Sequence, residues 1–220
     1  MKNSPLLVRL LVIGSLFLVA VTIGYFIIRP SGELPVYNPS QLDPRLVGDA
    51  AKNEKGVHHI SPFHLIDQDG DSVSLADVKG KVVLADFFFT TCGSICPKMS
   101  TQLIRVQEKY KDEDRLMLLS HSVTPETDSV PVLKAYAEKY GVYHKRWRLM
   151  TGSREQIYRL ARNSYFAAVD EGDGGPDDFV HTENFVLVDP QGRIRGFYDG
   201  TKPAEVDKAM ADIRILLHGL

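Results

Sequence analysis

Cysteine is almost absent from this chain of 220 residues, which contains only Cys92 and Cys96. A small secreted domain held together by disulfides would carry several pairs. The chain also has no excess of either charge, because 26 basic and 28 acidic residues leave a net charge of −2. A nucleic-acid-binding protein normally shows a basic surface, so we expect no nucleic-acid partner. The composition is that of an ordinary globular domain with an additional apolar segment.

Charged residues are missing from 10–28, a run of mostly apolar residues near the N-terminus. As a helix, this run would be about 28 Å long, close to the roughly 30 Å hydrocarbon core of a bilayer. A cleaved signal peptide is the competing interpretation, but its apolar region is shorter and ends in small residues. This run ends in the bulky sequence YFII followed by Arg29. We therefore expect a transmembrane anchor at 10–28 after a short N-terminal tail at 1–9.

The segment after the anchor, 29–57, contains four prolines and little periodicity, which predicts a tether. The remaining residues, 58–220, are expected to form the folded domain. The basic residues on the two sides of the anchor give only a weak orientation signal. Because a single N-terminal anchor usually exports the domain behind it, we expect a single-pass cell-membrane protein. Its soluble domain would face the periplasm or the cell exterior.

From residue 58 onward, predicted strands alternate with predicted helices. Continuous apolar runs at 81–89 and 115–123 are typical of strands that are buried on both faces. Further strands are expected on either side of an Asp69–Gly70 turn, at 146–152, and in a hairpin around Gln191–Gly192. Helices are expected from Pro97 onward, at 130–141, at 153–164 with Ser153 as a cap, and at about 203–217. This order predicts an α/β fold with a mixed sheet flanked by helices.

The two cysteines lie in TTCGSICPKMS (90–100), directly after a predicted strand and before a predicted helix. Free amide groups and the helix dipole at such a position favour the thiolate form. Residues four apart share one helix face, with Cβ atoms about 5–6 Å apart, which permits either a shared metal ion or a disulfide. Thiolates suit Cu(I) or zinc, but structural zinc sites need four ligands. An inert cystine is disfavoured because the loop it closes is too small to stabilise much. The spacing leaves a metal site and a redox dithiol open.

A third metal ligand would be a histidine that the fold brings close to the cysteines. The chain has seven candidates: His58, His59, His64, His121, His144, His181 and His218. Any one of them is more often a surface or core residue than a ligand. His181 stands out because it ends a loop rich in Gly and Asp and begins the predicted strand HTENFVLVDP, a junction where sites are often built. His121, inside the strand LLSHSV, is expected in the core.

These motifs resemble the Sco/SenC family of thioredoxin-like, membrane-anchored copper proteins. The resemblance covers about 58–218 and rests on three segments: CGSICP (92–97) after a buried strand, SVTPETDSVPVLKAYA (122–137), and His181–Thr182 before the hairpin VLVDPQGRIRGFY (186–198). It implies a thioredoxin-like fold and one copper ion bound by Cys92, Cys96 and His181. It also implies a role in maturing the binuclear copper site of cytochrome c oxidase, by delivering copper or by reducing the cysteines of that site.

Two positions depart from the family pattern. Thr124 stands where the family often has Asp before the Pro–Glu pair, and Val180 stands where a small or acidic residue often precedes the histidine. Neither is an expected ligand. The resemblance implies the copper-site subunit of cytochrome c oxidase as a partner, with other copper chaperones or thiol reductants as further candidates.

Two other functions stay open. One is a thiol–disulfide oxidoreductase or thiol peroxidase that acts on exported proteins and uses Cys92 and Cys96 as a redox dithiol. The other is a copper or redox sensor.

Overall fold

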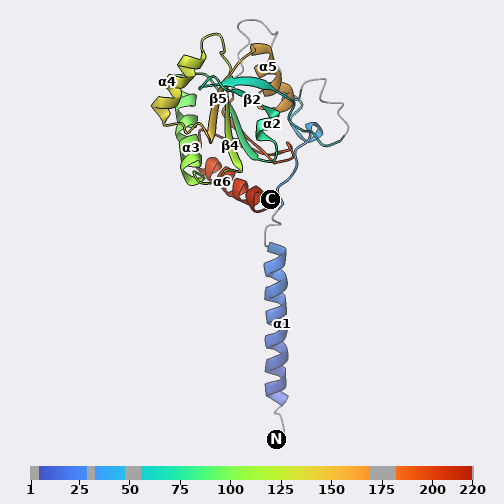
Figure 1. Ribbon diagram of the computed structural model, residues 1–220. Helices are drawn as coiled ribbons and strands as arrows, with labels where there is room; N and C mark the ends of the chain where they lie inside the picture. The colour runs from blue at the N-terminus through green and yellow to red at the C-terminus, as the bar shows by residue number, and fades with distance from the viewer. Residues whose placement is uncertain (1–4, 29–32, 48–55, 169–181, 220) are drawn as a thin grey trace. The chain divides into compact units, whose positions relative to one another are not determined.

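The computed structural model of the protein describes residues 5–28, 33–47, 56–168 and 182–219 (Figure 1). The chain divides into two compact units between Glu33 and Leu34. The first unit contains helix α1 (Pro5–Ile28). None of its residues from Val8 to Tyr25 is buried. By length and composition, α1 is able to cross a membrane, which agrees with the apolar run that the sequence shows.

The second unit is built on a seven-stranded mixed sheet with the order β2-β1-β5-β4-β3-β6-β7 in the described residues. The strands are β1 (His64–Asp67), β2 (Ser72–Ser74), β3 (Val82–Phe88), β4 (Leu116–Ser122), β5 (Trp147–Thr151), β6 (Asn184–Val188) and β7 (Ile194–Asp199). The central strands β3, β4 and β5 are parallel, whereas the pairs towards both edges are antiparallel. The expected mixed sheet is confirmed.

Helices cover both faces of this sheet (Figure 1). Helices α3 (Ile95–Lys109), α4 (Val130–Tyr140) and α6 (Pro203–His218) share one apolar core with the sheet. The other face carries α2 (Leu75–Val78), α5 (Arg154–Arg159) and the π-helical turn η2 (Leu160–Ser164). The domain therefore has three layers, and β3 lies in the middle one.

Strand β3 is buried at all seven of its positions. It pairs in parallel with β4, from Val82 opposite Leu116 to Phe88 opposite Ser122, and it pairs with β6 on its other side. A central strand covered on both faces needs apolar residues at every position, which explains the continuous run in the sequence. The chain leaves β3 at Phe88, only a few residues before Cys92.

Helix boundaries differ from the sequence expectations in two places. Helix α3 begins at Ile95, so Pro97 lies within its first turn. The N–H groups of a first turn have no acceptor within the helix, so a proline there costs no hydrogen bond. The helix expected at 153–164 is instead α5 followed by η2. The predicted cap is confirmed, because Ser153 accepts a hydrogen bond from the backbone N–H of Gln156.

Part of the segment expected to be a tether packs on the domain. The backbone N–H of Tyr37 donates to the carbonyl of Ile194 at 2.9 Å, and its ring meets Phe197 edge-on at 5.6 Å between centroids. Val47 is buried as well. These contacts make Leu34 the first residue of the compact domain.

A buried polar group lies within the central strands. The Asp86 carboxylate of β3 accepts a hydrogen bond from the Ser120 hydroxyl of β4, and the Trp147 indole N–H donates to the same hydroxyl at 2.8 Å. Burial raises the pKa of Asp86 to about 7, although the Ser120 hydrogen bond opposes this shift. The folded domain therefore holds a carboxyl group that titrates near neutral pH.

The raised pKa of Asp86 predicts a pH-dependent stability. The folded chain binds one more proton than the unfolded chain between the unfolded pKa of about 3.9 and the folded value. The contribution of Asp86 to the free energy of unfolding is fully present below about pH 4 and is lost as the pH rises to about 7. In Asp86→Asn, this dependence should disappear. The unfolding free energy of the variant minus that of the wild type should therefore increase by about 1.4 kcal/mol for each unit by which the pH rises across this range.

Chemical denaturation of the metal-free protein at pH 4, 5, 6 and 7 measures this difference. Other titrating groups cancel because both proteins contain them. A difference that stays constant over the range would contradict the assignment to Asp86.

Candidate metal and redox site

Residues 89–94, which we name the cysteine turn, connect β3 to α3. Cys92 is half-buried in this turn, and Cys96 is the second residue of α3, where it is 2% exposed within the apolar core. Both are free thiols. The expectation that the two side chains share one helix face is wrong, because Cys92 lies before the helix begins. The thiols are brought together by the turn and not by helical spacing.

The first turn of α3 directs its backbone towards the sulfur of Cys92. The N–H of Cys96 donates to Cys92 Sγ at 3.4 Å, and Ser94 Oγ lies 3.9 Å from the same sulfur. Burial opposes ionisation of Cys92, but hydrogen bonds from the backbone of Cys96 and Ser94 outweigh it and lower the pKa of Cys92 to about 7. A large fraction of Cys92 is therefore thiolate at neutral pH.

Cys96 behaves in the opposite way. Burial raises the pKa of the Cys96 thiol to about 12; a backbone hydrogen bond from Phe89 opposes this shift, and the nearby Cys92 adds to it. The prediction of a favoured thiolate is thus correct for Cys92 and wrong for Cys96. The pair consists of one reactive thiolate and one protonated thiol. Cys96 loses its proton only when its sulfur binds a metal ion or forms a disulfide bond.

The predicted third ligand, His181, lies outside the described residues. The described chain resumes at Thr182, a buried residue whose hydroxyl accepts a hydrogen bond from the N–H of Asn184 at 3.1 Å. In the antiparallel pairing of β3 with β6, Ala85 is opposite Val186. The first residues of β6 therefore lie beside the end of β3 that leads to the cysteine turn.

The expected core position of His121 is confirmed, since its side chain is fully buried. Its ring stacks on Phe87 with 4.8 Å between centroids, and Nδ1 lies 3.1 Å from the carbonyl of Asp86. Burial lowers the pKa of His121 to about 4, so the ring is neutral. His121 is a core residue and does not face the thiols.

The remaining histidines are spread over the domain. His58 is buried, and its Nε2 lies 2.8 Å from the carbonyl of Ser164. The others are exposed: His59, His64, His144 and His218. Within the described residues, no group of three or more His, Cys, Asp or Glu side chains is arranged to hold a metal ion.

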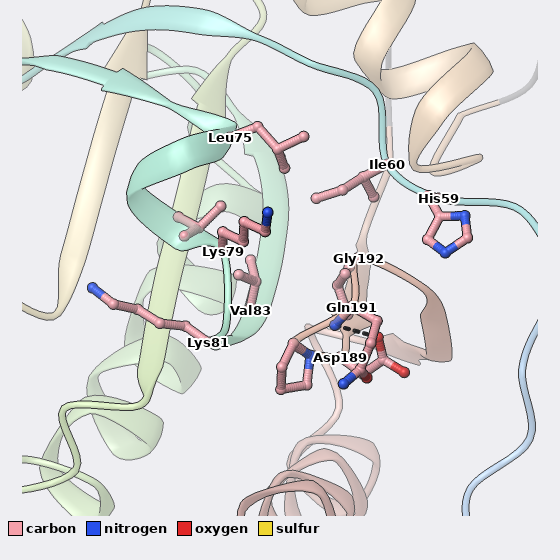
Figure 2. Close-up of a pocket in the computed structure, with 12 residues that line it drawn as sticks. His59, Ile60, Leu75, Lys79, Lys81, Val83, Asp189, Gln191 and Gly192 are labelled. Carbon is pink, nitrogen blue, oxygen red and sulfur yellow. Dashed lines mark hydrogen bonds between the residues drawn. The ribbon is translucent and has the colours of Figure 1, made fainter. Parts of the chain in front are cut away.

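A cavity of about 450 Å³ lies elsewhere in the domain (Figure 2). It is lined by Lys81 and Val83 at the start of β3 and by Asp189, Gln191 and Gly192 at the turn between β6 and β7. Neither cysteine lines it. The thiol chemistry therefore belongs to the opposite end of β3.

Asp86 is a residue near the thiols that the sequence interpretation missed. The pKa of Cys96 is raised in part by the Asp86 carboxylate, in addition to the larger effect of burial. The signal was present in the sequence, because Asp86 is the only acidic residue within the apolar run 82–89. A single acid in a strand buried on both faces has to be paired or protonated.

Comparison with known proteins identifies relatives over most of the folded domain. The family model described as SCO1/SenC matches residues 51–218. The SCO1 protein homolog of Bacillus subtilis is 36% identical over 159 residues, which are 71% of this chain and 82% of that protein.

Solved structures agree with this match. BsSco is 34% identical with a TM-score of 0.62, and the match covers 73% of this chain and 94% of that one. BsSco is described as having a disulfide switch and as a member of the Sco family of cytochrome c oxidase assembly proteins. Arabidopsis thaliana ScoI, solved with copper bound, is 28% identical with a TM-score of 0.55, covering 70% of this chain and 98% of that one. The fold of this chain is thus the thioredoxin-like fold of these structures.

The unequal thiols predict unequal alkylation. In the metal-free reduced protein, Cys92 should react first with iodoacetamide, and its rate should rise with pH around a midpoint near 7, because the thiolate is the nucleophile. Cys96 should remain largely unmodified up to pH 9. Mass spectrometry of the peptides that contain each cysteine measures both rates.

Cys96→Ser provides the control for this experiment. The N–H that donates to Cys92 Sγ belongs to the backbone, so the variant should keep a Cys92 midpoint close to 7. Equal rates for the two cysteines, or a Cys92 midpoint near the ordinary value of about 8.5, would contradict the description.

Proposed function

The chain belongs to the SCO1/SenC family, and on that premise we propose that it binds one copper ion through Cys92, Cys96 and His181. We further propose that it supports maturation of the binuclear copper site of cytochrome c oxidase. The observation that carries the proposal is the pair of interacting free thiols at the start of α3. Relatives solved with copper bound and the assembly role printed for BsSco support it.

The donor chemistry of the cysteines fits copper(I). Two sulfur donors are soft ligands, which copper(I) prefers over the hard oxygen ligands that suit magnesium or calcium. Cys92, with a pKa near 7, is partly deprotonated at neutral pH and would bind first, whereas Cys96 has to release its proton. Copper binding should therefore release protons and strengthen as the pH rises. The ion is the cargo that the protein would pass to its target.

His181 is proposed as the third ligand. Support comes from the path of the chain, because Thr182 follows it directly and the first residues of β6 lie beside the end of β3. An imidazole nitrogen is a suitable third donor for copper.

The membrane arrangement is also a proposal. The anchor at 10–28 would hold the compact domain, which begins at Leu34, close to the membrane, facing the periplasm or the cell exterior. The apolar helix α1 supports the anchor. Cytochrome c oxidase is itself a membrane protein, so a membrane-held donor and its target would share one surface.

Thiol–disulfide exchange is the second candidate function. The Cys92 thiolate would attack a target disulfide, and Cys96 would then displace the target, leaving two thiols on the target and a disulfide on this chain. The unequal pKa values of the two thiols favour this order of attack. The disulfide switch described for BsSco also supports it. The same pair can serve both functions, because reduction of a target's cysteines prepares them to receive copper.

Anaerobic titration with copper(I) in competition with a chelator tests the ligand set. The wild-type protein should bind one copper ion per chain. Cys92→Ser, Cys96→Ser and His181→Ala should each weaken binding at least tenfold, because each removes one proposed donor. His144→Ala is the matched control, since His144 is an exposed histidine outside the proposed site, and it should bind copper like the wild type.

Binding that survives loss of both cysteines would contradict the copper site. If His181→Ala bound copper normally, His181 would not be a ligand. Turnover of a protein disulfide by a chain that binds no copper would instead favour the oxidoreductase.

A further inference from the structure

Asp128 is a fully buried carboxylate between β4 and α4. One of its oxygens accepts hydrogen bonds from the Ser122 hydroxyl at 2.6 Å and from the Thr124 hydroxyl at 3.0 Å. Both donors belong to the end of β4 and the segment that follows it. A buried charged group is stable only when its oxygens are well supplied with donors, and these contacts meet that requirement in part.

The other donors to Asp128 come from the cysteine turn. The backbone N–H of Thr90 donates to the same oxygen at 3.1 Å, and the Thr90 hydroxyl donates to the second oxygen at 2.5 Å. Thr90 is only two residues before Cys92. A single carboxylate thus joins the segment after β4 to the segment that carries the first thiol.

Within the cysteine turn, one backbone hydrogen bond is long. The N–H of Cys92 reaches the carbonyl of Phe89 at 3.3 Å, beyond the usual distance of about 2.9–3.0 Å. At the start of the turn, the N–H of Val123 holds the carbonyl of Phe88 at 2.8 Å. Val123 therefore fixes the end of β3, and Asp128 extends that restraint two residues further towards Cys92.

We propose that Asp128 is a positioning residue that holds the cysteine turn so that the Cys92 and Cys96 thiols stay close together. The copper part of this inference rests on the proposed function, whereas the disulfide part does not. A turn restrained in advance loses less conformational freedom when a metal ion or a disulfide joins the two sulfurs. Releasing the turn should weaken both reactions together.

Three substitutions separate positioning from simple stabilisation. Asp128→Ala removes every acceptor that Thr90 uses on this side chain. Asp128→Asn keeps the shape, and its amide can replace the second oxygen if the Thr90 hydroxyl accepts instead of donating. Thr90→Val removes only the hydroxyl and leaves the backbone N–H in place.

Asp189 offers a matched control at the other end of the sheet. It is also a buried carboxylate, and it accepts hydrogen bonds from the backbone of Gln191 and Arg193 in the turn between β6 and β7. Asp189 follows Val188, which is opposite Val83 near the start of β3. Cys92 follows the other end of β3, so Asp189 is far from the thiols. Asp189→Ala should lower the denaturation midpoint without changing the chemistry of the thiols.

The experiment measures two equilibria on the full-length protein in detergent. The first is the dithiol–disulfide equilibrium of the metal-free chain in dithiothreitol buffers, and the second is copper(I) affinity by chelator competition. In Asp128→Ala, the equilibrium constant for disulfide formation and the copper affinity should each fall about tenfold. The change in the disulfide equilibrium raises the midpoint potential of this two-electron couple by about 30 mV. Thr90→Val should show a smaller shift in the same direction. Asp128→Asn and Asp189→Ala should stay within twofold of the wild type in both equilibria.

If Asp128→Ala leaves the midpoint potential unchanged or lowers it, the positioning role is overturned. The same conclusion follows if Asp189→Ala shifts the potential equally, because general destabilisation would then explain the effect. If the wild-type protein fails to bind copper, the proposed function fails, and the dithiol–disulfide equilibrium still decides the role of Asp128. If Asp128→Ala does not fold, the difference between Thr90→Val and Asp189→Ala in that equilibrium decides it.

Discussion

The position of both thiols depends on where β3 ends. This strand is buried along its whole length between β4 and β6, so its register cannot slip without exposing apolar side chains or breaking two ladders of hydrogen bonds. The cysteine turn begins at this fixed end, and α3 begins where the turn finishes. The thiols are therefore held between a fully buried central strand and the N-terminus of a helix.

That position makes the two thiols chemically different although they are only four residues apart. Cys92 lies outside the helix and receives the N–H of Cys96, whereas Cys96 lies inside the core and lacks comparable compensation for its burial. One thiol is therefore ready to bind or attack, and the other reacts second. This order suits a soft metal ion and disulfide exchange equally well, which explains why the local geometry supports both chemistries.

Much of this arrangement could be predicted from the sequence. The apolar run ending at Phe89 predicted β3, and the position of the cysteines after it predicted that they lie between this strand and a helix; that Cys92 precedes the helix was not predicted. The unequal pKa values could not be predicted, because they depend on how deeply each sulfur is buried. The two hydrogen bonds from Thr90 to Asp128 also required the fold, since these residues are distant in sequence. The same holds for the packing of Tyr37 on β7, because nothing local in a proline-rich segment indicates that contact.

The proposed site requires that two cysteine sulfurs and one histidine nitrogen bind the same copper ion. X-ray absorption spectroscopy of the copper(I)-loaded protein tests this ligand set, because it counts the sulfur and nitrogen neighbours of the metal. We expect two sulfur neighbours and one nitrogen neighbour in the wild type, with the nitrogen lost in His181→Ala. A spectrum with one sulfur neighbour, or with only nitrogen and oxygen neighbours, would contradict it.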